Sequence, residues 1–188
     1  KRIEGTIAQM LEEAVLFVQR NMRIKTIIDE NGKRNDKTEY PIKAVREAIL
    51  NALMHRDYSI HTEGTPVRII LYHDRLEILN EGGLYGRLTL DNLGKIHSDT
   101  RNQTLTNILE LQKIAENRYS GIPTIRYEMQ KYNLVYAPTH QKTLRNRIFR
   151  FRTSSSWRLR FEYRLCPSAQ AESCLQETRC RSEREKYP

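Results

Sequence analysis

Residues 46–59 read REAILNALMHRDYS, and this stretch decides the fold. It predicts a helix over about residues 42–56, because apolar residues recur at helical spacing and Pro41 precedes them, where proline is favoured. Glu47 and Asn51 are four residues apart, so they lie one turn apart on the same helix face. The residues expected on the opposite, core-facing side are Val45, Ile49, Ala52 and Leu53.

A carboxylate and a carboxamide stacked in this way suit a hydrated divalent metal ion. The side-chain oxygen of Asn51 is a neutral ligand of the kind that Mg²⁺ accepts, and Glu47 can orient or deprotonate a water molecule. The alternative interpretation is structural, since Glu and Asn one turn apart on a solvated face are a frequent arrangement. The residues that follow in the sequence favour the first interpretation.

Two short strands are expected after this helix. Residues 66–72 are rich in β-branched side chains, residues 75–80 alternate in polarity, and His73-Asp74 between them is typical of a hairpin turn. The second strand ends directly before Gly82 and Gly83. Glycines allow the backbone to approach a ligand closely, so this loop is a candidate binding loop.

A second candidate binding loop contains Ser120 and Gly121. It precedes a helix that is expected to start at Pro123 and to run to about Lys131. The positive end of a helix favours phosphate. The order along the chain is therefore a helix with Glu47 and Asn51, a hairpin, a glycine loop, a further helix, a Ser-Gly loop and a last helix.

In this order and with these residues, the chain resembles the domain family of the RecG-type ATP-dependent DNA helicase C-terminus. That family is a divergent branch of the GHKL superfamily, which includes gyrase, Hsp90, histidine kinases and MutL. The resemblance covers roughly residues 1–133 and is carried by REAILNALMHRDYS (46–59), DRLEILNEGGL (74–84), Arg101-Asn102 and ENRYSGIPTI (116–125). It implies an α/β (α+β) two-layer sandwich of GHKL (Bergerat) type, with helices on one face of a mixed, mostly antiparallel sheet.

The resemblance also implies roles for particular residues. Glu47 would be the catalytic base that activates water, and Asn51 would bind Mg²⁺. The adenine-binding Asp of the superfamily falls on Asn80, which is followed by the glycines of the motif. The residues implied to bind the cofactors ATP and Mg²⁺ are thus Asn51, Asn80, Gly82, Gly83, Ser120 and Gly121.

Two positions depart from the family pattern. Asn80 stands where Asp is usual, although an Asn side chain can still hydrogen-bond an amino group. Tyr119 stands where the family has the first glycine of a Gly-Thr-Gly motif, and its bulk would crowd a phosphate. We therefore expect ATP hydrolysis to be slow or absent.

The family name includes the word helicase, but the sequence lacks the nucleotide-binding motif of a helicase motor. A motor of that type needs the motif G-x4-G-K-[ST] to hold phosphates and Mg²⁺. The Gly-Lys pairs are Gly32-Lys33 and Gly94-Lys95, and they are followed by Arg34 and Ile96. The chain therefore lacks the P-loop of a helicase motor.

The HRDY segment at residues 55–58 has two interpretations. His55 and Arg56 could face a phosphate. Alternatively, the cations stabilise the negative end of the helix, with Asp57 as the partner of Arg56. We favour the second interpretation on sequence grounds.

The remaining segments complete the expected organisation. A helix over 7–22 and a polar loop over 29–39 form an N-terminal region, 1–40, and a further helix is expected over about 104–116 within a GHKL-like domain, 41–133. Residues 157–165 alternate strictly and predict a strand, with 148–152 as its hairpin partner in a closing hairpin, 134–165. Residues 166–188 are predicted to be a disordered basic tail, because they carry many charges and few apolar side chains.

The charge is concentrated in this C-terminal part. The chain has a net charge of +9, and residues 141–188 hold 12 Lys/Arg against 5 Asp/Glu, so the rest of the chain has a net charge of only +2. The basic residues are compatible with contacts to nucleic acid, with closing strands of the sheet, or with out-of-frame translation. Cys166, Cys174 and Cys180 lack the spacing of a zinc site, and we expect free thiols.

The favoured function is a nucleotide-binding-like (ATP/Mg²⁺) domain of a bacterial transcriptional regulator. The resemblance implies DNA contacts through other domains of the parent protein, and the start without Met or an apolar leader predicts a fragment of a longer chain. We expect a cytoplasmic protein with no membrane partner, and a homo-oligomer is compatible with the sequence. The alternatives are an oligomerisation or interaction module that has lost nucleotide binding, and a DNA-binding fragment that uses the basic tail.

Overall fold

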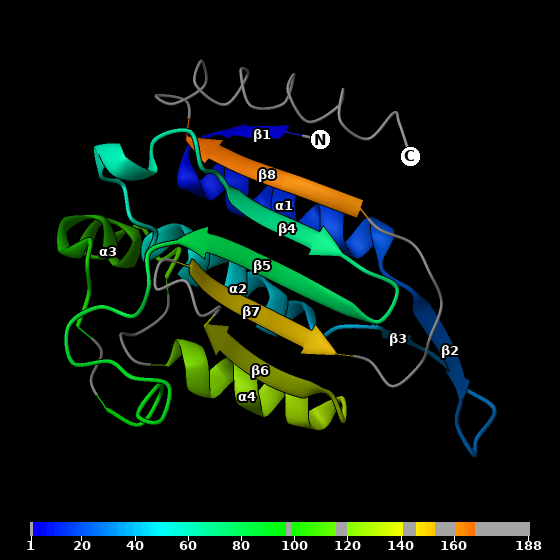
Figure 1. The fold of residues 1–188 in the computed structure, drawn as a ribbon. Coiled ribbons are helices and arrows are strands. Elements are labelled where there is room, and N and C mark those ends of the chain that lie inside the picture. Colours follow the sequence, from blue (N-terminus) through cyan, green and yellow to red (C-terminus); the bar gives the residue numbers. More distant parts are fainter. Residues whose placement is uncertain (1, 97–98, 116–119, 141–145, 153–160, 168–188) are drawn as a thin grey trace, which may run out of the picture.

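The computed structural model describes residues 2–96, 99–115, 120–140, 146–152 and 161–167. Its main feature is a six-stranded sheet in the order β1-β8-β4-β5-β7-β6 (Figure 1). All neighbouring strands are antiparallel except β1 and β8, which are parallel. The strands are β1 (Arg2–Gly5), β4 (Val67–Leu71), β5 (Arg75–Glu81), β6 (Val135–His140), β7 (Asn146–Arg152) and β8 (Phe161–Pro167).

Three helices lie on one face of this sheet, behind the strands in Figure 1. They are α1 (Ile7–Asn21), α2 (Ile42–Met54) and α4 (Gly121–Lys131). The shorter helix α3 (Gln103–Leu111) lies beyond one end of the strands, and a single 3-10 turn, η1 (Ile60–Thr62), follows α2. The fold is therefore of the mixed α+β class, with mostly antiparallel pairing.

The core fills the space between the helices and the sheet. Helix α2 is central, because it contacts α1 on one side and α4 on the other. Its apolar residues are almost completely buried, as are the core-facing residues of β4 and β5. Each buried Leu or Ile side chain contributes about 1.5–3 kcal/mol of transfer free energy. The fully buried members include Val45, Ile49, Leu53, Ile69, Leu76 and Ile78.

The polar segment 29–39 is only partly a loop, so that prediction needs correction. Residues 34–38 form β3 (Arg34–Thr38), which pairs with β2 (Ile24–Ile28) in a separate hairpin that projects beyond the sheet (Figure 1). The turn between them is held by Asp29, whose carboxylate accepts hydrogen bonds from the backbone N–H groups of Asn31 and Lys33 at 3.0 and 2.8 Å. The strand was not predicted because β3 is mostly exposed, so its residues are polar and show no alternation of apolar side chains.

The expected hairpin between residues 148–152 and 157–165 is wrong in its pairing. The strands β7 and β8 both belong to the sheet, but β4 and β5 lie between them. Strand β8 pairs with β1 and β4, whereas β7 pairs with β5 and β6. The β4–β5 hairpin has two free edges, and each takes one of these strands. Strand β8 pairs with β4, and β7 pairs with β5.

Three other segment boundaries shift. Helix α3 ends at Leu111, before the expected end at about residue 116. Helix α4 begins at Gly121 instead of Pro123, which places the proline inside the first turn, where its missing N–H is tolerated. Strand β8 extends to Pro167, so Cys166 and Pro167 lie in the sheet and not in a tail. Residues 168–188, Cys174 and Cys180 among them, lie outside the described residues, so the prediction for that tail stays a prediction, as does the proposed division into domains.

Candidate functional site

Helix α2 brings Glu47 and Asn51 into direct contact. The Asn51 Nδ2 atom donates to Glu47 Oε1 at 2.7 Å and to the Glu47 backbone carbonyl at 2.8 Å. Asn51 is only 6% exposed, although polar residues are seldom buried so deeply on a helix. The predicted placement of the two side chains on one face is therefore present, and the pair is locked by its own hydrogen bonds.

The start of helix α4 lies directly against this pair. A Cβ atom built on Gly121 would lie 2.4 Å from Glu47 Oε1 and 2.8 Å from Asn51 Nδ2, so a side chain there would displace the ends of both side chains. Ser120 is the N-cap residue, and its carbonyl accepts the N–H of Thr124 at 2.8 Å. The Glu47 carboxylate thus lies at the positive end of α4, where a negative charge is stabilised.

Asn80 lies at the end of β5 and is 2% exposed. Its Nδ2 atom donates to the Glu81 carbonyl at 3.3 Å. Its Oδ1 atom is buried and has no hydrogen-bond partner within the described part of the chain. A buried acceptor left without a partner costs about 1–3 kcal/mol, so this oxygen is a candidate position for a hydrogen-bond donor.

Gly82 follows directly and has a positive φ of +104°. A Cβ atom at this position would lie 2.9 Å from the backbone nitrogen of Asp57, and that N–H donates to the Glu81 carbonyl at 2.9 Å. The glycine is therefore required by the close approach of the loop to the end of α2, a reason that the sequence alone did not provide. Gly83 comes next and is half-buried.

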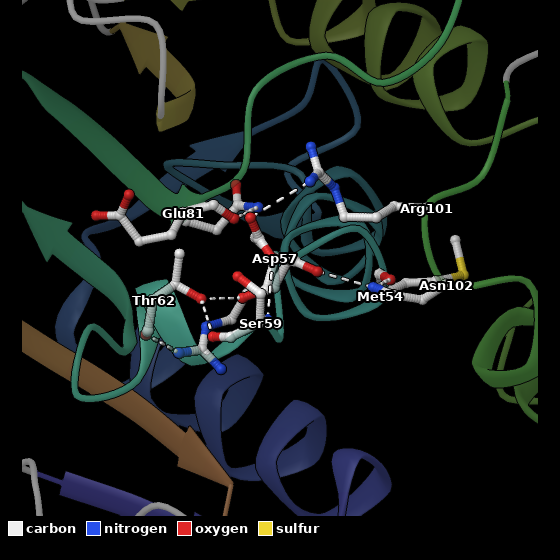
Figure 2. A network of polar contacts seen from close by, with 9 residues as sticks. Met54, Asp57, Ser59, Thr62, Glu81, Arg101 and Asn102 are labelled. Carbon is white, nitrogen blue, oxygen red and sulfur yellow. Dashed lines mark hydrogen bonds and ion pairs between the residues drawn. The ribbon is translucent and has the colours of Figure 1, made fainter.

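The residues Arg101 and Asn102 tie a distant loop to the C-terminal end of α2 (Figure 2). The Asn102 Nδ2 atom donates to the carbonyls of Met54 and Arg56 at 2.9 and 2.7 Å. Arg101 forms an ion pair with Asp57 at 3.3 Å. Sequence reasoning did not assign these two roles, although Arg101-Asn102 was among the segments that carry the family resemblance.

Arg56 binds the backbone of the segment that follows α2, whereas the second interpretation of the HRDY segment assigned it to the negative end of the helix. It is completely buried, and its Nη2 atom donates to the carbonyls of Thr62 and Thr65 at 3.0 and 2.7 Å. Its guanidinium also lies 5.0 Å from the centre of the Tyr58 ring. Asp57 forms an ion pair with Arg101, and the charge of Arg56, the partner that the prediction named, also lowers the pKa of Asp57.

The Asp57 carboxylate is held in its charged form. The backbone N–H of Ser59 donates to it at 2.9 Å, and this hydrogen bond is the largest cause that lowers the pKa of Asp57. The nearby Arg101 and Arg56 guanidinium groups lower the pKa further. The carboxylate thus organises the turn after α2 and holds Arg101 at the same time.

Helix α2 connects the two clusters. The N–H of His55 donates to the Asn51 carbonyl at 3.0 Å, and a Cβ atom on Gly82 would lie 3.4 Å from the His55 carbonyl. One cluster therefore holds Glu47, Asn51 and Gly121, and the other, one turn further along, holds Gly82 next to Asp57, with Asn80 two residues before it. Tyr119, expected to crowd this site, lies outside the described residues.

Within the residues that the structure describes, no group of three or more His, Cys, Asp or Glu side chains is placed to hold a metal ion. The same described ranges contain no helix that is both long and apolar enough to cross a membrane.

The chain is similar to a known protein family over part of its length. Residues 64–149 match the family described as "Putative ATP-dependent DNA helicase recG C-terminal". The matched segment includes Asn80, Gly82, Gly83, Ser120 and Gly121 but begins after Glu47 and Asn51. It spans somewhat less than half of the chain, so the chain is similar to an ATPase-like domain of RecG-related proteins over that segment.

Among solved structures, the DIP2311 protein of Corynebacterium diphtheriae is similar in fold, with a TM-score of 0.60 and 19% sequence identity. The similarity covers 76% of this chain and 28% of that protein, so the chain corresponds to a minor part of that protein's length. At this identity the similarity concerns the fold alone. A comparison with curated proteins gives no match.

Proposed function

We propose that this chain is a nucleotide-binding domain that takes ATP with Mg²⁺ and that it belongs to a bacterial transcriptional regulator. In this proposal the fold is a two-layer sandwich of GHKL (Bergerat) type, and the site is formed by Glu47 and the implied cofactor-binding residues. The family matched by residues 64–149 supports an ATPase-like domain. The three helices on one face of a mostly antiparallel sheet agree with the fold.

The observation that carries the proposal is the buried Oδ1 atom of Asn80. Its amide nitrogen donates one hydrogen bond, to the Glu81 carbonyl, whereas its oxygen accepts none within the described part of the chain. A nucleobase with an exocyclic amino group offers the donor that would satisfy it, as adenine does. The adjacent glycines leave the backbone of this loop without Cβ atoms, which supports close approach of a ligand.

The cluster of Glu47, Asn51 and Gly121 supports the requirement for Mg²⁺. A triphosphate at the start of α4 would lie close to the Glu47 carboxylate, because Gly121 at the start of this helix lies against it. The negative charges of the triphosphate and the carboxylate would repel each other. A divalent cation held by Asn51, and by Glu47 directly or through water, would offset that repulsion. Bound Mg²⁺ would supply charge neutralisation for phosphate, while Glu47 would hold or accept a proton from water.

Slow or absent hydrolysis remains part of the proposal. Glu47 Oε1 accepts a hydrogen bond from Asn51, and a carboxylate that is already engaged is a weaker base toward water. Asn80 and Tyr119 stand at positions where the family pattern has other residues. The domain would then act as a sensor of nucleotide more than as an enzyme.

Calorimetric titration of the full chain with ATP, with and without Mg²⁺, tests the proposal. We expect binding that requires Mg²⁺, that Asn51→Ala abolishes in a variant that stays folded, and that Asn80→Leu weakens. Asn107→Ala, an exposed Asn on α3, is the matched control and should bind like the parent. Unchanged ATP affinity in Asn51→Ala would show that the site is assigned to the wrong residues.

A second candidate is an interaction or oligomerisation module that has lost nucleotide binding. It is favoured by the fact that Glu47 and Asn51 satisfy each other and that Gly121 lies directly over them. The same titration separates the two candidates, because a module without ligand would give no heat with ATP at any Mg²⁺ concentration. DNA contacts, whether through other domains of the parent protein or through the basic tail, and homo-oligomer formation stay separate proposals.

A further inference from the structure

The loop that follows Gly82 and Gly83 carries an aromatic side chain with no assigned function. Tyr85 is 43% exposed, and the guanidinium carbon of Arg101 lies 5.1 Å from the centre of its ring. A cation at this distance from an aromatic ring is attracted to the ring face. One face of Tyr85 is thus covered by Arg101, and the exposed area is left for a second contact.

The position of Arg101 fixes where this ring lies. Arg101 is paired with Asp57 at 3.3 Å, and the backbone of Asp57 contacts Gly82. The chain from Gly82 to Tyr85 is three residues long and can extend at most about 11 Å. Tyr85 is therefore held beside the glycine loop, on a segment that begins two residues after Asn80.

The Nε atom of Arg101 gives a second reason to consider this cluster. It is buried and has no hydrogen-bond partner in the described part of the chain. The guanidinium is thus not placed to satisfy all of its own donors, yet it is held between Asp57 and the Tyr85 ring.

We propose that Tyr85 is the residue on which the base of the bound nucleotide stacks, backed by Arg101. This inference rests on the proposed function. It adds a contact between Tyr85 and the face of the base to the proposed hydrogen bond between Asn80 and the edge of the base. Flat π-systems stack on tyrosine irrespective of their hydrogen-bonding pattern, so Tyr85 would contribute affinity and Asn80 selectivity. Tyr85 would be a binding residue and would take no part in phosphate chemistry.

Binding of Mg²⁺-ATP and of inorganic triphosphate to the full chain tests this inference. Tyr85→Leu removes the π-face, and we expect ATP affinity to fall roughly 5- to 150-fold, the equivalent of about 1–3 kcal/mol. Triphosphate, which has no base, should bind this variant as it binds the parent. Tyr85→Phe keeps the ring and should bind ATP within about twofold of the parent.

Tyr127 provides a matched control. It is 60% exposed on α4, and Lys131 lies 4.2 Å from its ring centre, so it is also an exposed tyrosine beside a cation. Tyr127→Leu should leave both ligands unaffected.

The outcomes separate the two proposals. If the parent binds neither ligand, the proposed function fails, and this inference fails with it. If the parent binds ATP and Tyr85→Leu binds it equally well, only the stacking role is overturned. An equal loss for ATP and triphosphate, or a loss in Tyr85→Phe as large as that in Tyr85→Leu, overturns it as well.

Discussion

Gly121 faces the carboxylate of Glu47 so closely that a methyl group on Gly121 would lie 2.4 Å from Glu47 Oε1. Gly121→Ala should therefore displace the end of the Glu47 side chain and break its hydrogen bond with Asn51. The lost hydrogen bond is worth about 0.5–1.5 kcal/mol, while Ala favours a helix over Gly by up to about 1 kcal/mol. Chemical denaturation should show a stability change within about 1 kcal/mol.

The same variant should lose Mg²⁺-dependent ATP binding by at least about tenfold, a threshold that corresponds to about 1.4 kcal/mol. Glu47→Ala removes the closest clashing atoms and leaves the Asn51 Nδ2 contact at 2.8 Å, so adding Gly121→Ala in that background should change stability less than in the parent. Normal ATP affinity in Gly121→Ala would mean that the ligand does not use the α4 terminus.

Asn102→Ala should destabilise the fold through helix α2 and not through α3. The Asn102 amide donates to two carbonyls at the end of α2, and its loss leaves both without that donor. We expect a decrease of about 1–3 kcal/mol in the free energy of unfolding. In contrast, the exposed Asn107→Ala on the same helix should change it by no more than about 0.5 kcal/mol. Equal effects would contradict the role given to Asn102.

Arg56→Lys should destabilise the protein although the charge is retained. The buried guanidinium donates to two carbonyls from one Nη2 atom, and the shorter-reaching ammonium cannot reproduce that planar geometry. Hydrogen bonds to charged groups are worth about 1.5–3 kcal/mol, so a loss of that size is expected in urea denaturation. Arg20→Lys, at an exposed position in α1, should be neutral. Recovery of full stability in Arg56→Lys would contradict this account.

The stability of the fold should depend on pH through Asp57. The folded-state pKa of Asp57 is lowered, chiefly by the Ser59 N–H, so its contribution is present above the unfolded pKa and is lost as the pH falls through the folded value. Melting temperatures of the parent and of Asp57→Asn should differ at pH 7. The difference should shrink as the pH decreases below about 4. A constant difference across the titration would assign the stabilisation to something other than the charge.

Local patterns predicted the elements with a strong periodicity. The α2 helix and the β4–β5 hairpin agree with their predicted spans within about two residues, because their apolar spacing records which side faces the core. Strands β2 and β3 were missed, since they are exposed and polarity does not alternate where neither face is buried. The pairing of β7 and β8 was wrong because periodicity identifies a strand but not its neighbour.

The candidate site was predictable where it depends on spacing within one helix. Glu47 and Asn51 contact each other for that reason alone. The role of Asn102 was not predictable, because an Asn directly before a helix is expected to cap that helix. In the structure Asn102 is the N-cap residue of α3, but its side chain forms no capping hydrogen bond with α3. Its amide donates to the Met54 carbonyl at the end of α2 instead. The role depends on a contact between residues 46 or more positions apart in sequence.

The position of β8 between β1 and β4 has a consequence for synthesis of the chain. Among the described strands, β1 is synthesised first, and it pairs with β8, which is synthesised last. Until then, both β1 and the outer edge of β4 have unpaired backbone groups, which invite pairing with other chains. Such long-range pairing is slow, because the entropy of closing the intervening loop is lost before any contact forms. The sheet can therefore be completed only after translation has passed Pro167, and the nascent chain needs protection of these edges until that point.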